Sequence, residues 1–375
     1  MNMSRFAPYL GIVAALLLGV FVVIFFDELT ALNSPASPSA AVSDISPIFV
    51  GPSASPPPAA LPQQSPIKNA ASAAVMPAPQ REVPTPAPVA ATTTSPSESA
   101  ALLGASALTL RAALVNIICY APVGSNAHSI LGSGVFIDPK GVILTNAHIA
   151  KYFLLADRNV SCTIRAGGPA TDTYKAALIY ISPMWLQANA DVLSQTLPKG
   201  TGEYDFALLA VTGSTTAEPL PSSFPSIPLA TNPPLSSVPV IIASYGAQSL
   251  EPDQIRSALF PTIVLGSVKD VLTFAVNTVD VLALGGSAAA QEGSSGGGVS
   301  DASGELVGTI TTSTIQGDAN SRSLNAITAS YIRAAYASET GQALDLLLAR
   351  PTADSISDFA PQLSALEKII TANLP

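Results

Sequence analysis

The distribution of proline is the feature that most clearly divides this chain into a segment that can fold and one that cannot. Fifteen of its 33 prolines fall between Pro35 and Pro96, among residues that are mostly Ala, Ser and Thr. Such a stretch lacks the periodic apolar residues that would offset the entropy lost on ordering, so residues 28–103 are predicted to be a disordered, partly polyproline linker. A plain spacer is the simpler role for it, and recognition by a partner is the alternative. A folded core must come from residues 104 onward.

Residues 1–27 are predicted to be a transmembrane anchor. Residues 6–26 carry no charge, and at about 1.5 Å each they span roughly 31 Å as a helix, about one bilayer core. Arg5 precedes the run and Asp27 follows it, so the positive-inside rule places the N-terminus in the cytoplasm and everything after residue 27 outside it, periplasmic or extracellular. A cleaved signal peptide is the alternative, and it gives the same location for the rest of the chain.

Composition argues against several classes of function. Charged residues make up 11% of the chain, the net charge is -9, and no cluster of Lys or Arg stands out, so no nucleic-acid partner is expected. The two histidines are His128 and His148, and Cys119 and Cys162 lack metal-ligand spacing. The sequence therefore predicts no metal site.

Short β-prone runs separated by turn residues follow from residue 114. Residues 132–137 and 142–145 flank an Asp-Pro-Lys-Gly turn, the signature of a hairpin. Many short strands with few helices favour a mostly β fold of barrels or sandwiches over βαβ units. Residues 346–375 show helical spacing of apolar residues and are predicted to be a C-terminal helical tail that packs against the strands, an oligomer contact being the alternative.

Three separate segments offer the groups that acyl transfer by serine requires, namely a base, an anion that orients it, and N–H donors. His148 ends a Thr-Asn-Ala-His run after a strand, and Asp205 stands directly before an apolar strand. Ser295 lies among glycines at residues 293–298, before a turn and another strand. Alone, each has a simpler interpretation as a surface histidine, a turn aspartate or a flexible loop. Their order and their flanking strands favour catalysis.

These segments resemble the trypsin-like serine peptidases, and in particular the HtrA/Deg branch. The family pattern G-S-G-x-x-I, T-N-x-H, D-x-A-x-L and G-x-S-G-G is met at residues 132–137, 145–148, 205–209 and 293–297. The resemblance implies two six-stranded antiparallel β-barrels of chymotrypsin type in residues 104–345. It implies protein or peptide substrates and no metal or organic cofactor.

Carried over position by position, the resemblance assigns His148 as general base and acid, Asp205 as its orienting acid and Ser295 as nucleophile. The amides of Gly293 and Ser295 would form the oxyanion hole. The substrate pocket would be lined by Ala289, Ala290, Thr311 and Thr312. Because Ala289 stands where trypsin-type enzymes carry an aspartate, we expect a preference for small or medium apolar side chains.

The sequence departs from the family pattern at two positions near the nucleophile. Ser294 replaces the usual Asp or Asn, so activation by an ion pair with a freed N-terminus is not expected. Glu292 places a charge beside the expected oxyanion hole. The alternative to an active protease is therefore a catalytically inactive binding module with the same fold. The chain beyond residue 345 is too short for the PDZ domain of many HtrA relatives, so none is expected.

Closure of the N-terminal barrel is expected to bring Cys119 and Cys162 together, and outside the cytoplasm they are predicted to form a disulfide. Two buried free thiols are the alternative. HtrA relatives are often trimers, but no residue of this chain independently indicates an oligomer. A homo-oligomer is therefore left open. A further alternative is an anchored surface protein in which the triad is accidental, and the order of the motifs argues against it.

Overall fold

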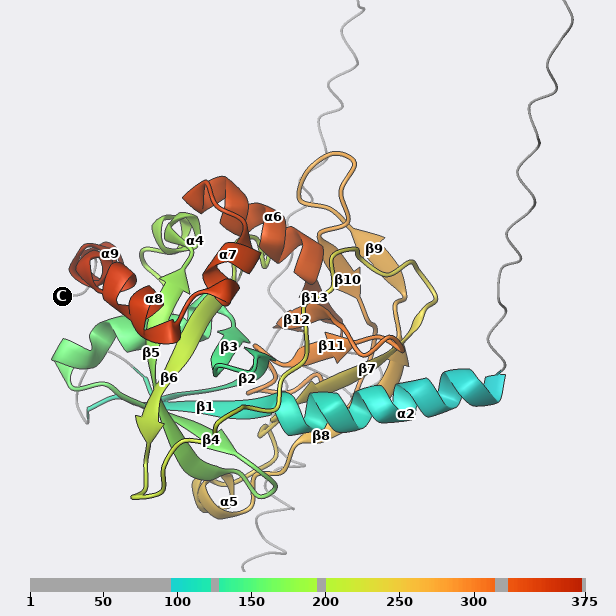
Figure 1. The fold of residues 1–375 in the computed structure, drawn as a ribbon, viewed down its shortest axis with the longest axis horizontal. Coiled ribbons are helices and arrows are strands. Elements are labelled where there is room, and N and C mark those ends of the chain that lie inside the picture. The colour runs from blue at the N-terminus through green and yellow to red at the C-terminus, as the bar shows by residue number, and fades with distance from the viewer. Residues whose placement is uncertain (1–95, 123–127, 194–199, 314–322, 373–375) are drawn as a thin grey trace, which may run out of the picture. The chain divides into compact units, whose positions relative to one another are not determined.

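The computed structural model describes residues 96–122, 128–193, 200–313 and 323–372. The predicted anchor and most of the predicted linker lie outside these residues. Within them, no helix combines the length and the apolar character that crossing a bilayer requires. The fold is mostly β, as predicted, with helices at its C-terminal end (Figure 1).

The first half of the fold is a closed barrel of six antiparallel strands, in the order β1-β2-β3-β6-β5-β4. Its strands are rich in Val, Ile and Leu, which fit a pleated, buried surface. A short helix α3 (Ala147–Ala150), the 3-10 helix η2 (Lys151–Arg158) and helix α4 (Pro183–Ala188) lie between strands. The strands are β1 (Leu114–Tyr120), β2 (Ile130–Asp138), β3 (Val142–Thr145), β4 (Ser161–Ala166), β5 (Thr171–Ile181) and β6 (Ala207–Ser214).

The second half differs from the predicted six-stranded barrel, because it is a seven-stranded sheet in the order β8-β7-β11-β12-β13-β10-β9. Its edge strands β8 and β9 are consecutive in the chain, and only Val268 and Lys269 separate them. The Val268 amide donates to the Val238 carbonyl, and the next amide, that of Lys269, donates to the Ala283 carbonyl. The two edge strands therefore follow one another along the chain, and the sheet forms a half-barrel in which β8 and β9 do not pair with each other. The strands are β7 (Pro239–Ser244), β8 (Thr262–Ser267), β9 (Asp270–Leu272), β10 (Val281–Ala283), β11 (Gly298–Ser300), β12 (Leu306–Ser313) and β13 (Leu324–Thr328).

Helix α2 (Pro96–Ala113) corrects the predicted end of the linker, because residues 96–103 are helical. Leu103, Ser106 and Leu110 recur at helical spacing and are buried, and the Ser106 hydroxyl hydrogen-bonds the Ser300 hydroxyl of β11 (2.8 Å). This face packs α2 against β2, β7 and β11. Burial of this stripe stabilises a helix that the Pro-, Ala- and Ser-rich composition of the linker did not predict.

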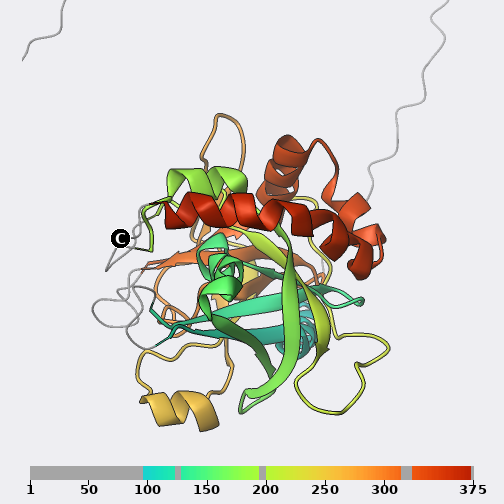
Figure 2. The same cartoon turned by 90° about the vertical axis from the view of Figure 1, so that its left-hand side faces the viewer.

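The predicted C-terminal helices are present, and they cover the first barrel. Helix α8 packs on β5, and α9 packs on α4 and η2, while α6 lies against β12 and β13 (Figure 2). Helix α5 lies apart from these, between β7 and β8. The helices are α5 (Pro252–Ser257), α6 (Ala329–Thr340), α7 (Leu344–Ala349), α8 (Thr352–Phe359), the 3-10 turn η4 (Ala360–Gln362) and α9 (Leu363–Thr371).

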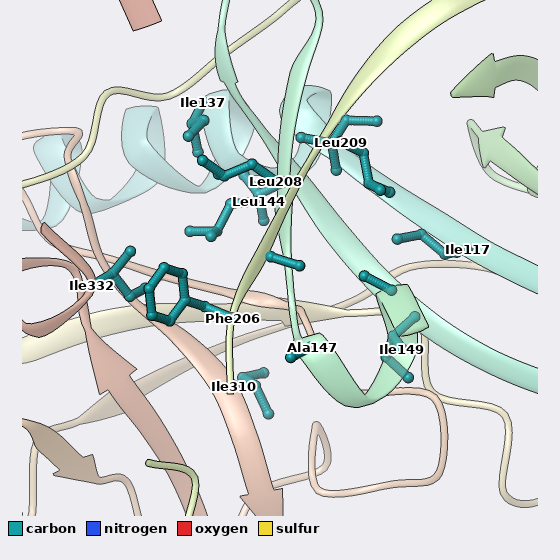
Figure 3. Packing of buried hydrophobic residues seen from close by; sticks show 14 of the residues in the cluster. Ile117, Ile137, Leu144, Ala147, Ile149, Phe206, Leu208, Leu209, Ile310 and Ile332 are labelled. Atoms are coloured by element: carbon teal, nitrogen blue, oxygen red, sulfur yellow. The ribbon is translucent and has the colours of Figure 1, made fainter. Parts of the chain in front are cut away.

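One hydrophobic core joins the two halves. Leu144 and Leu208 from the barrel, Phe206 at its edge, Ile310 of β12 and Ile332 of α6 all belong to it and are buried (Figure 3). Phe206 and Ile310 immediately adjoin Asp205 and Thr311 in the chain. The segments that carry the candidate site are therefore anchored by buried neighbours on both sides of the interface.

Candidate active site

The structure brings His148 and Asp205 together. His148 lies in helix α3 directly after β3, and Asp205 lies directly before β6, which pairs with β3. The His148 amide donates to Asp205 Oδ1 (2.9 Å), and its ring Nδ1 lies 2.7 Å from Asp205 Oδ2. Asn146 adds a third contact by donating to the Asp205 carbonyl (2.9 Å). Strand pairing thus turns 57 residues of separation into direct contact.

This contact decides which ring nitrogen of His148 could act as a base. An ionised carboxylate only accepts hydrogen bonds, so Nδ1 must carry the proton that it donates to Asp205. In the neutral ring, Nε2 then keeps a free lone pair. The His148 side chain is 24% exposed and that of Asp205 is 6% exposed, so the imidazole ring is reachable from solvent while its partner is not.

Burial alone would raise the pKa of Asp205, but the charge attraction and hydrogen bonds of His148 outweigh it and lower this pKa below its usual value. The Thr311 hydroxyl contributes in the same direction, since it donates to Asp205 Oδ2 (2.7 Å). Asp205 is therefore ionised at neutral pH despite being buried. Thr311 comes from β12 of the second sheet, so both halves of the fold hold this carboxylate.

Ser295 lies in the tight loop that leads into β11. Gly296 has a φ of +84°, and a Cβ at this position would lie 2.0 Å from the Ser133 carbonyl oxygen and 2.5 Å from Thr145 Oγ1. Only glycine therefore lets the loop approach β2 and the end of β3, three residues before His148. In the described part of the chain, no hydrogen bond joins the His148 ring to the half-buried Ser295 hydroxyl.

The backbone of this loop leaves two amides unused. The amides of Ser294, Gly296 and Gly297 donate to carbonyls within the protein. Those of Gly293 and Ser295, the predicted oxyanion donors, donate to no group among the described residues. Unsatisfied amides at a half-buried position can donate hydrogen bonds to an anionic oxygen of a ligand.

The predicted pocket residues fall into three different situations. Ala289 and Ala290 are fully buried in the turn before Ser295. Thr311 was predicted to line the pocket, but its hydroxyl is directed to Asp205. Thr312 pairs through its backbone with Asn325 of β13. Sequence reasoning missed the contact of Thr311, because 106 residues separate it from its partner.

Ser294 and Glu292 leave the loop well ordered. The Ser294 side chain is buried, and its hydroxyl accepts from the Gln291 amide (3.1 Å) and donates to the Ala289 carbonyl. Ser294 thus closes its own turn in place of the ion pair that an aspartate would form. The Glu292 side chain is exposed, so solvent screens its charge.

The predicted disulfide between Cys119 and Cys162 is confirmed. The two residues are direct neighbours across β1 and β4. His128, the other histidine, is exposed. No group of three or more His, Cys, Asp or Glu side chains within the described ranges could hold a metal ion.

Lys151 is a buried charge that sequence reasoning missed. Its Nζ donates to the His148 carbonyl (2.6 Å) and lies 4.8 Å from the Tyr152 ring centroid. Burial lowers the pKa of Lys151 from 10.5 to about 8, although the Asp205 carboxylate opposes the shift. A lysine in a short turn is normally expected in solvent, so the sequence held no signal for it.

Comparison with known proteins gives a matching family model and two similar solved structures. A family model described as a trypsin-like peptidase domain matches residues 132–308. The Rv3671c protease of M. tuberculosis in its active form is 20% identical, with a TM-score of 0.41, over 69% of this chain and 93% of that one. The inactive form of its serine-to-alanine mutant is 18% identical, with a TM-score of 0.41, over 67% of this chain and 96% of that one. No curated protein sequence matches the chain.

The span that the family model matches contains His148, Asp205 and Ser295. Its strands form the first barrel from β2 onward and the second sheet as far as β12. The chain therefore carries a trypsin-like peptidase domain.

Proposed function

We propose that the chain is a serine endopeptidase of the HtrA type that acts by a Ser-His-Asp acyl-enzyme mechanism. The observation that carries the proposal is the His148–Asp205 contact of 2.7 Å, placed beside a glycine-rich serine loop in which two amides find no acceptor in the described part of the chain. A base, its orienting acid and oxyanion donors are what acyl transfer needs.

In this mechanism His148 Nε2 takes the proton from the Ser295 hydroxyl while the oxygen attacks the scissile carbonyl. The resulting oxyanion is held by the amides of Gly293 and Ser295. His148 then passes its proton to the leaving amine, and the C–N bond breaks to leave an ester on Ser295. Water, deprotonated by the same ring, hydrolyses the ester and restores the free hydroxyl. Asp205 stays ionised throughout and balances the imidazolium.

The contact between His148 and Ser295 is expected to form when substrate binds. In ligand-free hydrolases, catalytic hydrogen bonds are often long and tighten only in the complex. The Ser295 oxygen is carried on a single rotatable bond, and rotation about it is the simplest adjustment.

Small or medium apolar side chains are the proposed preference before the scissile bond. Ala289 and Ala290 support it, because neither position supplies a carboxylate to bind Lys or Arg. A panel of fluorogenic peptides that differ at this position should give the highest kcat/KM for Ala, Val or Leu. Faster cleavage after Lys or Arg would contradict the preference.

The proposed location is the outer side of a membrane, to which residues 6–26 anchor the enzyme. The apolar length of this run and the charges around it support the proposal. Substrates would then be exported or misfolded proteins that approach the membrane. The full chain should stay in the membrane fraction after alkaline extraction, and release into the supernatant would argue for a cleaved signal instead.

Labelling with a fluorophosphonate probe tests the enzymatic proposal directly. The full-length protein in detergent should react, and Ser295→Ala should abolish labelling. Ser303→Ala, which removes a hydroxyl from the turn after β11, should label like the wild type. Failure of the wild type to label at any pH would instead favour an inactive binding module with a protease fold.

A further inference from the structure

The peptide groups that carry the two oxyanion donors are each fixed through their carbonyl oxygen. The Glu292 carbonyl accepts a hydrogen bond from the Ala247 amide (2.9 Å), and the Ser294 carbonyl accepts one from the Gly297 amide (2.9 Å). In a trans peptide the N–H points opposite to the C=O. These bonds therefore direct the Gly293 N–H away from Ala247 and the Ser295 N–H away from Gly297. Both contacts are made by backbone groups, and no side chain controls them.

The peptide group between those two is held at both ends. Its N–H, that of Ser294, donates to the Gln291 carbonyl (3.1 Å), and its carbonyl is bound by a side chain, that of Ser133 in the Gly-Ser-Gly motif of β2. Its hydroxyl donates to the Gly293 carbonyl (2.8 Å) and accepts from the Tyr245 amide (2.8 Å). Because Tyr245 occupies a lone pair of the oxygen, the hydroxyl proton is directed at Gly293. The amide of Ser133 also donates to the Ser295 carbonyl (2.7 Å). One residue thus holds the carbonyls of both oxyanion-donor residues.

Ser133 has no solvent exposure, so water cannot replace its hydroxyl if it is removed. Gly293 has a φ of +87°, and glycine offers little resistance to rotation of the peptide group that follows it. If that group turned, the two peptide groups on either side would have to move with it, and their amides would no longer converge.

We propose that Ser133 is a positioning residue for the oxyanion hole, with its hydroxyl holding the Gly293 carbonyl so that the amides of Gly293 and Ser295 face one point. The inference rests on the proposed serine protease function. It is a role for the side chain of the motif serine, separate from the backbone contact of the same residue, which any amino acid except proline would preserve.

The test compares Ser133→Ala with Ser244→Ala in the full-length protein. Ser244 is also fully buried, adjoins the same loop near Gly297, and its hydroxyl has no partner among the described residues. Ser133→Ala should lower kcat about 10- to 100-fold, somewhat less than loss of an oxyanion donor itself, with KM changed less than about twofold. Affinity for a peptide aldehyde should fall in parallel with kcat. Ser244→Ala should match the wild type.

Ser133→Thr keeps a hydroxyl and should retain a kcat closer to the wild type, which also covers the case in which Ser133→Ala does not fold. A wild-type kcat in Ser133→Ala, or a rise in KM alone, would overturn the inference. If the wild type neither turns over substrate nor labels, the proposed function fails, and a crystal structure of Ser133→Ala decides the inference alone. A rotated Gly293 carbonyl would support it, and an unmoved one would refute it.

Discussion

Thr309 and Thr311 lie two residues apart on β12 and are both buried, yet their hydroxyls differ in partners. Thr311 donates to Asp205, whereas the Thr309 hydroxyl has no partner among the described residues. Removing a hydrogen bond to a buried charge costs about 1.5–3 kcal/mol, and removing an unpaired hydroxyl costs little or stabilises. Substituting each threonine in turn therefore separates the contribution of the hydrogen bond to stability from that of burying the side chain.

Thr311→Val should lower the free energy of unfolding by about 2 kcal/mol at neutral pH and reduce kcat, while Thr309→Val should leave both unchanged or raise stability. The pKa of Asp205 is lowered in the folded state, so its stabilisation is present above the unfolded pKa and is lost as pH falls through the folded value. Loss of the Thr311 donor raises that folded pKa. Acid unfolding of Thr311→Val, followed by circular dichroism, should therefore begin at higher pH than in the wild type.

Lys151 gives a pH dependence of the opposite sign. Its pKa is about 8 in the folded state against 10.5 in the unfolded chain, so between these values the unfolded chain binds more protons and stability rises with pH. The gain from this one group is about 2 kcal/mol between about pH 8 and about pH 9.5. Below that range both states are charged and the full cost of burial remains.

Urea denaturation at a series of pH values should show this rise in the wild type. It should be absent in Lys151→Met and kept in Lys175→Met, which removes an exposed lysine. An identical rise in all three proteins would assign the pH dependence to other groups. Tyrosines whose pKa is raised by burial, such as Tyr245 at about 12, act in the opposite sense only near pH 10 and above.

At the residue scale, the sequence motifs identified two side chains, His148 and Asp205, that meet in the structure. His148 follows strand β3 and Asp205 precedes strand β6. Because these two strands pair, the two side chains come into contact. The roles of Ser133 and Thr311 were not predictable in this way. Each hydroxyl meets a partner more than 100 residues away in the chain, and neither the strand pattern nor hydrophobicity encodes such a contact.

At the scale of elements, the disulfide is the clearest agreement between sequence and structure, and it lends itself to a test. It joins neighbouring strands β1 and β4 across 43 residues. A cross-link that closes a loop of this length is expected to contribute about 4 kcal/mol by reducing the entropy of the unfolded chain. Cys119→Ala/Cys162→Ala should lower the urea midpoint accordingly, and reductant should lower it in the wild type but not in the variant. Equal midpoints for all forms would contradict a stabilising role.

One element prediction was wrong, and one further segment departs from the structure that its composition favours, both for local physical reasons. Residues 273–277 have the composition of a strand, but they form a compact turn around Asp280. Its carboxylate accepts hydrogen bonds from the Thr273 hydroxyl, the Phe274 amide and the Thr278 hydroxyl. The linker was predicted to continue to residue 103, but α2 begins at Pro96, where proline suits a first helical turn. Hydrogen bonds from a side chain to the backbone decided the structure of the first segment, and burial against the sheet decided that of the second.

At the scale of the whole molecule, the site draws on both halves of the fold, so their mutual position matters. His148 and Asp205 belong to the first barrel, whereas Ser295 and Thr311 belong to the second sheet. Helix α6 follows the last strand of the sheet and returns to the barrel, where Glu339 is its polar anchor. The Glu339 carboxylate accepts from the Tyr180 hydroxyl, from Ser182 Oγ (2.8 Å) and from the Met184 amide (3.1 Å).

Glu339→Ala should therefore destabilise the protein through both halves at once. It leaves the buried Tyr180 hydroxyl without its acceptor, and loss of such charged hydrogen bonds costs about 2–4 kcal/mol in all. Glu218→Ala, which removes an exposed carboxylate, should stay within about 0.5 kcal/mol of the wild type. Because the halves share one core, urea unfolding of Glu339→Ala should remain a single transition in which activity and circular dichroism are lost together at a lower midpoint. Loss of activity well before loss of structure would mean that α6 sets the position of the site without contributing to the stability of the fold.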